Sequence, residues 1–528
     1  MPIPHLPSGI TDIENRRLIE IPNMIEIKGA LFAIDSAKTP GPDGFGAGFF
    51  KKYWEILKHD FLQCIVEFFN NGHLLKNINH TFIALIPKRE NPTETDHYRP
   101  ISLCNTVDKT ISKILVNRLR PLLNKLVSPV QSTFIPGRSI HENILLTHEI
   151  MHKFKKVKGK QAWVALKLDM EKAYDRLEWP FIQQVLEQMR FHSKWIQWVM
   201  ECITTVSYSL LVNDEPSGMI RPTRGIRQGD PLSPYLFILC MEALSTTLLT
   251  EASKPKSGVG IKLSPGSARI PCLLFADDYL LFCKAESLVC SRLKNLLEAF
   301  CAHSGQLINY HKSTLTFSTN ASSSHRQVAA GIFNITHSES LGKYLGCPVF
   351  QKRPNVVTFR GLVDKVMAKL VGWKANCLSK AGRTVLIQSH LESIPSHTMQ
   401  CFQLPVTISD NIDRVNREFF WEKNLADKGL PLLAWDKLCR PKRYGGLSMR
   451  KTVAVNLTFQ CKLAWKIVTN QNSLWVHIIR SKYLGSKEFF SVQTKPGDSV
   501  VWRNILKCKD LIRKGLCWTI GDGKDISF

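Results

Sequence analysis

Residues 273–282 read LLFADDYLLF and place two adjacent aspartates, Asp277 and Asp278, in the middle of an apolar run. The flanks predict two short buried strands. The aspartates then fall in the tight turn of a hairpin, because neighbours within one strand point to opposite faces. Carboxylates removed from water are stable when they are paired or coordinate a cation. The hairpin is therefore a candidate metal platform, with a solvated Asp-Asp turn as the alternative interpretation.

The chain carries a large excess of positive charge. Its 70 Lys and Arg residues outnumber its 44 Asp and Glu residues, which gives a formal net charge of +26 at pH 7. This balance indicates a polyanionic partner, most often nucleic acid, with anionic membranes as the second option. We expect no membrane partner, because no stretch approaches about 18 uninterrupted apolar residues and the N-terminus lacks the apolar segment of a signal peptide. The sequence predicts an intracellular protein.

The length of 528 residues is enough for roughly three or four domain-sized units. With 44% hydrophobic and 22% charged residues, the composition is that of a globular protein. The fifteen cysteines are scattered, and none forms a Cys-x-x-Cys pair. Cys508 and Cys517 come closest to a zinc half-site, but their spacing is wrong, so we expect reduced thiols.

A third carboxylate follows another predicted strand. Residues 163–168 alternate and are apolar, and Asp169 stands at the end of this strand. Residues 224–231 form a polar Gly-rich loop leading into a helix, with Asp230 as the N-cap and Pro231 as the first helical residue. Two-metal phosphoryl transfer requires acids from separate strands that bridge two Mg²⁺ ions about 4 Å apart. The three acids and the loop together are consistent with that chemistry.

Residues 351–400 form a basic helical block with eight Lys or Arg residues against two acids. One face of its first helix is apolar, which leaves the cations pointing outward. We expect this block to bind nucleic acid through Lys365, Lys369, Lys374, Lys380 and Arg383.

In their order along the chain, these features resemble the reverse transcriptases of LINE-type (non-LTR) retrotransposons, particularly the plant kind. Asp169 to Asp175 resembles the first catalytic motif of the palm, Arg224 to Pro234 the nucleotide-binding loop, and residues 275–278 (FADD) the core motif. Further blocks resemble the fingers and the last palm motifs, at residues 38–44 (KTPGPDG), 98–103 (YRPISL), 131–140 (QSTFIPGRSI), 304–313 (SGQLINYHKS) and 344–346 (YLG).

The resemblance implies an α+β right-hand polymerase with fingers, a palm built on an antiparallel sheet, a helical thumb and a helical C-terminal extension. We expect an N-terminal extension and fingers in residues 1–160, the palm with part of the fingers in 161–350, the thumb in 351–425 and a truncated helical region in 426–528. We also expect the endonuclease and RNase H regions of a full element to be missing. Nuclear localisation is implied by the family alone.

The resemblance also implies roles for single residues. Asp169, Asp277 and Asp278 would hold two Mg²⁺ ions, which Mn²⁺ could replace, and Asp277 is the stronger candidate for direct ligation. Lys312 would act as general acid toward pyrophosphate, with an ordinary surface lysine as the alternative.

The predicted nucleotide contacts include Tyr174, which stands where the family has a steric gate against a ribose 2′-hydroxyl. Such a gate favours deoxynucleotides. The full set expected to contact the nucleotide is Lys88, Arg99, Tyr174, Arg227, Gln228 and Gly229.

The leading hypothesis is an RNA-directed DNA polymerase that extends a DNA primer on an RNA template with dNTPs. The alternative is a catalytically silent nucleic-acid-binding remnant, because elements of this kind decay. A group II intron maturase shares the palm and the basic thumb. The turn at residues 38–44 and the lack of a maturase-like C-terminal domain disfavour it.

Overall fold

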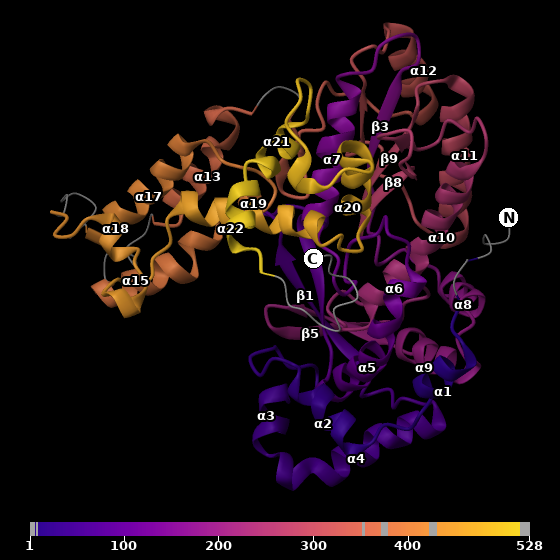
Figure 1. The fold of residues 1–528 in the computed structure, drawn as a ribbon. Coiled ribbons are helices and arrows are strands. Elements are labelled where there is room, and N and C mark those ends of the chain that lie inside the picture. Colours follow the sequence, from indigo (N-terminus) through magenta and orange to yellow (C-terminus); the bar gives the residue numbers. More distant parts are fainter. Residues whose placement is uncertain (1–5, 7–8, 351–353, 371–377, 422–429, 518–528) are drawn as a thin grey trace. The chain divides into compact units, whose positions relative to one another are not determined.

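The computed structural model describes residues 6, 9–350, 354–370, 378–421 and 430–517. The chain forms two compact units (Figure 1). The first unit comprises Met1–Ser139, Gly159–Ile261 and Arg269–Glu339, and the second comprises Ile140–Lys158, Lys262–Ala268 and Ser340–Phe528. Each unit is described by itself below.

The first unit contains the predicted antiparallel sheet. Its strands are β3 (Trp163–Asp169), β8 (Cys272–Phe275), β9 (Asp278–Lys284) and β10 (Thr314–Phe317), in the spatial order β10-β3-β9-β8. Every pairing is antiparallel. Figure 1 shows β3, β9 and β8 side by side. This four-stranded sheet, called the palm sheet below, confirms the expected palm architecture.

The centre of the palm sheet is fully apolar. Residues 272–274 and 279–283 are buried, as the apolar flanks of the Asp-Asp pair predict for strands covered on both faces. Helix α10 (Ser233–Ser253) packs against α8 (Trp179–Gln188) and α11 (Ser287–Ser304), and α11 also contacts β9. Helix α10 is long and apolar enough to cross a membrane, but 78% of its most apolar window is buried inside the protein. Its apolar character is therefore explained by its place in the core.

A second sheet in the first unit is mixed. It orders β2 (Tyr98–Leu103), β1 (His80–Pro87), β4 (Ser207–Val212) and β5 (Glu215–Ile220), and only the β1–β4 pairing is parallel. The remaining helices of the unit are α1 (Asp12–Leu18), α2 (Met24–Phe32), α3 (Ala47–Lys52), α4 (Trp54–Asn71), α5 (Thr106–Leu119), α6 (Leu123–Leu126), α9 (Ser193–Thr204) and α12 (Ser323–Phe333).

The second unit is predominantly helical. Helix α19 (Thr452–Val468) lies at its centre and contacts α17 (Val406–Trp421), α20 (Leu474–Ile479), α21 (Val500–Leu506) and α22 (Lys509–Gly515). The other elements are α7 (Ile140–Phe154), α13 (Val356–Ala368), α15 (Lys380–Ser389), α16 (Ser396–Met399), α18 (Trp435–Leu438) and the strand pair β11 (Lys343–Tyr344) and β12 (Cys347–Pro348). All regular elements described after residue 354 are helical, which confirms the helical character expected of this region.

Candidate active site

The three predicted carboxylates lie together at one end of the palm sheet. Asp169 is the last residue of β3, and Asp278, the first residue of β9, is its direct partner in the antiparallel register. Directly opposite residues present their side chains on the same face, with Cβ atoms about 5 Å apart. Asp277 occupies the two-residue turn that joins β8 to β9. The expected hairpin is confirmed, although Asp278 belongs to the strand rather than to the turn.

The acids are more accessible than the apolar run suggested. Asp169 and Asp277 are exposed and Asp278 is half-buried. The reason is their place at the end of the sheet, whose interior takes up the apolar neighbours on either side. Two effects therefore favour a bound cation, namely the partial burial of the acids and the repulsion among three neighbouring negative charges.

Burial, and after it repulsion, appear in the pKa values of two of the acids. Burial raises the pKa of Asp169, and the charge of Asp277 raises it further, whereas Lys312 and Lys167 act in the opposite direction. Burial also raises the pKa of Asp278, where Lys167 opposes the effect and the charges of Asp277 and Asp169 add to it. Within the described part of the chain, no ion pair shorter than 4 Å joins a cation to any of the three carboxylates. An added cation would relieve this repulsion.

Backbone contacts fix the position of the acids. The Asn309 N–H donates to the Asp169 carbonyl at 2.8 Å, and the Asp169 N–H donates to Ser313 Oγ at 3.2 Å. Lys312 lies in this same loop, and its N–H donates to Asn309 Oδ1 at 3.2 Å. The loop therefore explains why Lys312 is electrostatically coupled to Asp169.

The turn of the hairpin is held from a distant segment. Gln131 Oε1 accepts from the Ala276 N–H at 3.3 Å, and the Ser132 N–H donates to the Leu274 carbonyl at 3.2 Å. Ala276 has φ +53°, a left-handed conformation that costs energy for a residue with a Cβ. The segment at Gln131 thus stabilises a strained turn next to Asp277.

The ring of Tyr174 is held in place by a neighbouring aromatic ring. The ring stacks on Phe237 with centroids 5.0 Å apart and an interplanar angle of 7°. Burial raises the pKa of Tyr174 and the charge of Asp277 raises it further, so the phenol stays neutral.

The Gly-rich loop passes very close to two other backbone segments. Gly229 has φ +122°, and a Cβ there would lie 2.8 Å from the Ser102 carbonyl, while the Ser102 N–H donates to the Gln228 carbonyl at 2.7 Å. A Cβ on Gly225, which has φ +88°, would lie 2.7 Å from the Asp175 carbonyl. Only glycine fits such conformations at such distances. The loop is thereby fixed between β2 and the segment that carries Tyr174.

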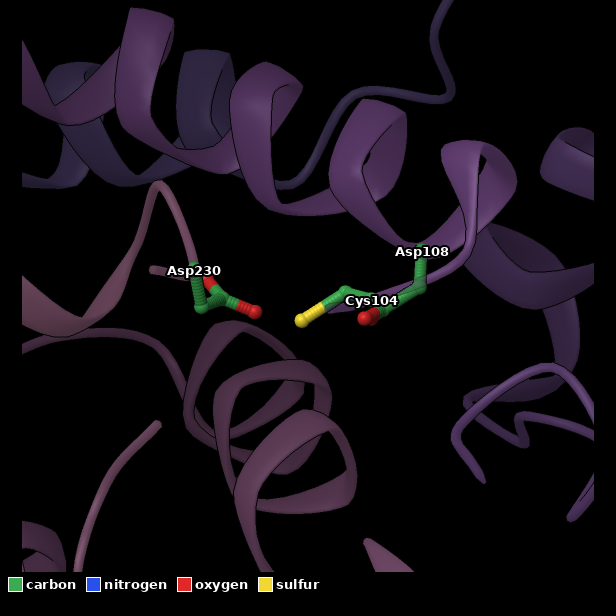
Figure 2. A group of neighbouring side chains, drawn as sticks. All are labelled: Cys104, Asp108 and Asp230. Carbon is green, nitrogen blue, oxygen red and sulfur yellow. The ribbon is translucent and has the colours of Figure 1, made fainter. Parts of the chain in front are cut away.

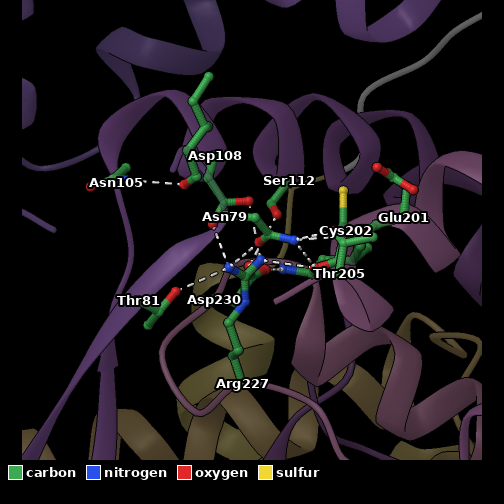
Figure 3. A network of polar contacts seen from close by, with 12 residues as sticks. Asn79, Thr81, Asn105, Asp108, Ser112, Glu201, Cys202, Thr205, Arg227 and Asp230 are labelled. Carbon is green, nitrogen blue, oxygen red and sulfur yellow. Dashed lines mark hydrogen bonds and ion pairs between the residues drawn. The ribbon is translucent and has the colours of Figure 1, made fainter. Parts of the chain in front are cut away.

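Arg227 departs from its expected role as a nucleotide contact. The residue is 4% exposed, and its guanidinium donates to Asp108 at 2.7 Å, to Asp230 at 2.6 Å and to Asn79 Oδ1 at 2.8 Å (Figure 3). These internal partners use the donors that a triphosphate would need. Arg227 therefore holds the loop from behind, and the other two predicted contacts on this loop, Gln228 and Gly229, remain accessible.

A second acidic group resembles a metal centre but already contains a cation. Ligand atoms of Cys104, Asp108 and Asp230 lie within 4.8 Å of one another (Figure 2). All three residues are buried. Burial raises the pKa of Asp108, and the adjacent Arg227 opposes the shift. Because Arg227 supplies the positive charge that these acids need, this group is a structural ion-pair network, and it does not fit a resident metal ion.

The structure places one further lysine, Lys172, and an acid, Asp96, beside the predicted phosphate contact Lys88. Lys172 Nζ lies 3.2 Å from Asp96 Oδ1, and Lys88 Nζ donates to the Asp96 carbonyl at 2.9 Å. Lys172, Lys88 and Lys312 all lower the pKa of Asp96. Lys172 thus pairs with an exposed carboxylate whose charge also interacts with Lys88 and Lys312. Lys172 lies inside the first palm motif and could have been noted there, whereas nothing in the sequence marked Asp96.

Arg99 is exposed on β2, in agreement with a ligand-facing position. Because β2 pairs with β1 in a register that opposes Arg99 to Ile86, the side chain lies near the end of the second sheet from which Lys88 emerges.

The predicted nucleic-acid contacts of the second unit differ from one another. Lys365 and Lys369 are exposed at the C-terminal end of α13. Lys380 Nζ donates to the Phe420 carbonyl at 2.5 Å. Arg383 is buried and donates to the Phe419 carbonyl at 2.8 Å, so it caps α17 instead of facing solvent. Lys374 lies outside the described residues.

Comparison with known proteins identifies the family. The sequence matches the reverse transcriptase (RNA-dependent DNA polymerase) family over residues 86–349. The transposon TX1 uncharacterized 149 kDa protein of Xenopus laevis is 28% identical over 426 residues, 78% of this chain and 31% of the relative. The Pol polyprotein from the type-2 retrotransposable element R2DM of Drosophila melanogaster is 28% identical over 250 residues, 47% of this chain and 22% of the relative. The chain spans less than a third of the length of these curated relatives.

A solved structure of telomerase from Candida albicans, in complex with a fragment of telomeric RNA, covers 79% of this chain and 67% of its own with a TM-score of 0.35 and 14% identity. The likeness at this level is weak, and the family match stands without it. That match covers half of the chain and includes the palm sheet, the three aspartates and the Gly-rich loop. The chain therefore belongs to the reverse transcriptase (RNA-dependent DNA polymerase) family, as a member of its LINE-type, non-LTR retrotransposon branch.

Proposed function

We propose that the chain is an RNA-directed DNA polymerase that adds deoxynucleotides to the 3′-hydroxyl of a DNA primer on an RNA template. The observation that supports this activity best is the opposition of Asp169 and Asp278 across β3 and β9, with Asp277 in the adjoining turn. Two of these carboxylates are exposed and one is half-buried, and none has a short ion pair among the described residues, so together they form a site for an external cation. The net charge of +26 suits a nucleic-acid substrate.

The donor set fits a hard divalent cation, because oxygen ligands with room for water and phosphate oxygens are what Mg²⁺ prefers. Members of this family generally use a divalent metal. We infer two Mg²⁺ ions held by Asp169, Asp277 and Asp278, and when bound they would activate the primer 3′-oxygen and stabilise the leaving pyrophosphate.

The other residues of the site position the dNTP. The rigid Tyr174 ring, stacked on Phe237, limits the space beside the sugar and so excludes a 2′-hydroxyl. Gln228 and Gly229 line the pocket from a loop that Arg227 anchors. Lys88, Lys172 and Lys312 present ammonium groups to the triphosphate, and Lys312 Nζ supplies a proton to the pyrophosphate as it leaves.

In this proposal, Asp96 is an internal substitute for phosphate. Its carboxylate neutralises part of the lysine charge until a nucleotide replaces it. The exchange favours a ligand with several negative charges, because one carboxylate cannot satisfy three lysines.

Primer extension tests the activity. Purified protein with Mg²⁺, poly(rA)/oligo(dT) and dTTP should extend the primer, and Asp277→Asn should reduce the rate about 100- to 1,000-fold, the usual effect of removing one group that stabilises transition-state charge. Asp214→Asn is the matched control, since Asp214 is an exposed aspartate in the two-residue turn between β4 and β5. The control should extend normally.

The same assay addresses the silent-remnant alternative. A protein that binds primer-template but does not extend it, or whose extension is equal in the Asp277→Asn and Asp214→Asn variants, would contradict the proposed enzyme.

A further inference from the structure

The second unit contains a cavity that the palm chemistry does not use. It has a volume of about 340 Å³ and lies between the end of α7, the π-helical turn Arg480–Leu484, residues 492–498 and the start of α21. Its charged lining residues are His152, Lys153, Lys156, Lys482, Lys495 and Asp498. We call it the lysine cavity. All of its lining residues belong to the second unit.

The acids at the lysine cavity do not balance its cations. Glu149, buried beneath it, accepts from Lys482 Nζ at 2.6 Å, from Tyr483 at 2.7 Å and from Ser499 at 2.5 Å. The negative charge of Glu149 is thus compensated by Lys482. Among the described residues, Asp498 is the only carboxylate in the lining itself, and one of its oxygens accepts from the Lys495 backbone N–H at 2.8 Å.

The other lysines are oriented by neutral groups. Lys153 Nζ donates to the Lys262 carbonyl, and Lys156 Nζ donates to the Gly497 carbonyl. Carbonyl oxygens hold an ammonium group in place but leave its charge uncompensated. Burial lowers the pKa of Lys153, and repulsion from Lys482 lowers it further. Burial and then Lys482 lower the pKa of His152 to about 4. The lysine cavity is therefore strongly electropositive.

One wall of the cavity is aromatic. Tyr483 stacks on Trp502 with centroids 4.7 Å apart and an interplanar angle of 7°. Lys482 Nζ lies 4.9 Å from the Tyr483 ring. Cationic groups beside aromatic surfaces are the usual elements of single-strand nucleic-acid sites. The sequence continues the positive charge, because four of the residues 153–158 are lysine and none is acidic.

We propose that the lysine cavity binds phosphate groups of a single-stranded polynucleotide, which gives the protein a nucleic-acid anchor in the second unit. Phosphodiester oxygens accept from Lys153, Lys156 and Lys495, and Asp498 limits entry to groups that reach the lysines. The identification of this strand as an RNA template rests on the proposed function. The binding of a polynucleotide by the lysine cavity does not depend on it.

Binding of a labelled strand tests the anchor. Lys156→Gln/Lys495→Gln removes two charges, while each amide keeps a donor, including one for the Gly497 carbonyl. Lys487→Gln/Lys514→Gln removes two charges from exposed lysines of the second unit outside the cavity. Fluorescence anisotropy with a fluorescein-labelled 20-nucleotide RNA, and with DNA of the same sequence, should be measured from 50 to 200 mM KCl. All proteins should carry Asp277→Asn and no dNTP should be present.

We expect the cavity variant to bind about five- to tenfold more weakly than the control variant at 100 mM KCl. The slope of log Kd against log salt should also fall by about 1.4, because two single-strand phosphate contacts are lost. Crosslinking of 4-thiouridine RNA should label the peptide that contains Tyr483 or residues 492–503. Weaker binding of RNA alone identifies the strand as RNA, and equal weakening of both strands identifies a general single-strand anchor.

Equal affinity and slope in the two double variants would overturn the proposal. Because the assay contains no polymerisation step, failure of the anchor and failure of the polymerase are separate results. A chain that extends primers normally but shows no cavity effect keeps the proposed function and loses the anchor.

Discussion

The first unit contains two groups of carboxylates that differ in the source of their counter-charge. Asp108 and Asp230 are buried, and the Arg227 guanidinium lies between them. Asp169, Asp277 and Asp278 lie at the end of the palm sheet, and no short ion pair joins them to a cation in the part of the chain that the structure describes. A cluster of carboxylates that is paired with a cationic side chain stabilises the fold, whereas a cluster without such a partner can bind a cation from solution. Sequence motifs alone do not separate these two cases.

The largest expected effect comes from removing the internal cation. Arg227→Met leaves two buried carboxylates unpaired, which should lower the free energy of unfolding by about 3–5 kcal/mol. Urea denaturation followed by tryptophan fluorescence measures the change. Arg221→Met, at an exposed arginine of the same unit, is the control and should be neutral.

If Arg227→Met does not fold, the triple variant Arg227→Met/Asp108→Asn/Asp230→Asn should recover soluble protein, because the unpaired charges are gone. A loss below about 1 kcal/mol for Arg227→Met would mean that the two acids are not held by Arg227.

Removing one palm acid should affect catalysis and leave folding intact. Asp278→Asn should slow primer extension about 100-fold. It should leave the free energy of unfolding equal or slightly higher, because one charge that Asp169 and Asp277 repel is lost. Primer extension and urea denaturation of the same preparation measure both quantities. A strongly destabilised Asp278→Asn protein would place this acid with the structural group.

Mg²⁺ should stabilise the protein only when the palm carboxylates are intact. At a free concentration ten times the Kd, one bound ion raises the free energy of unfolding by about 1.4 kcal/mol. Differential scanning fluorimetry with and without MgCl₂ should show this shift for wild type and Asp214→Asn but not for Asp169→Asn/Asp277→Asn. The same shift in all three proteins would indicate nonspecific ion binding.

The smallest effect is a pH dependence of Mg²⁺ affinity. The pKa values of Asp169 and Asp278 are raised in the folded protein. The two carboxyl groups therefore contribute their full share to the free energy of unfolding at pH values below their pKa in the unfolded chain. This contribution is lost as the pH rises through their pKa in the folded protein. A cation prefers the deprotonated acids, so protons compete with it as pH falls.

The MgCl₂ concentration that gives half of the thermal shift should be several-fold higher at pH 5 than at pH 7 for wild type. Equal values at the two pH values would show that Asp169 and Asp278 are fully ionised across this range and that their raised pKa values have no influence on binding.

The sequence allowed the antiparallel palm sheet and the hairpin at Asp277 to be predicted, because strand periodicity and turn position are local properties. The exposure of Asp277 was not predictable in this way, since the apolar run shows which residues are buried but not where the sheet ends. The contacts of Arg227 also escaped the sequence analysis. Its partner Asp108 lies 119 residues away, and no local pattern reveals that pairing.

Arg383 shows the same limit in the second unit. Its position in a basic helical block predicted an outward cation, yet the side chain is buried and caps the end of α17. A helical period identifies the apolar face of a helix, but it does not show which polar side chain a neighbouring helix will cover.

The pairing of β3 with β9 has a consequence for how the protein is made. On the ribosome, Asp169 emerges more than a hundred residues before Asp278, its partner in the sheet. Gln131 emerges 145 residues before Ala276, whose N–H donates to the Gln131 side chain. The edge of β3 that faces β9 must therefore remain unpaired until the hairpin is synthesised. Such long sequence separations slow folding. A nascent chain that stalls before residue 278 exposes an unpaired apolar strand, which is a site for chaperone capture or aggregation.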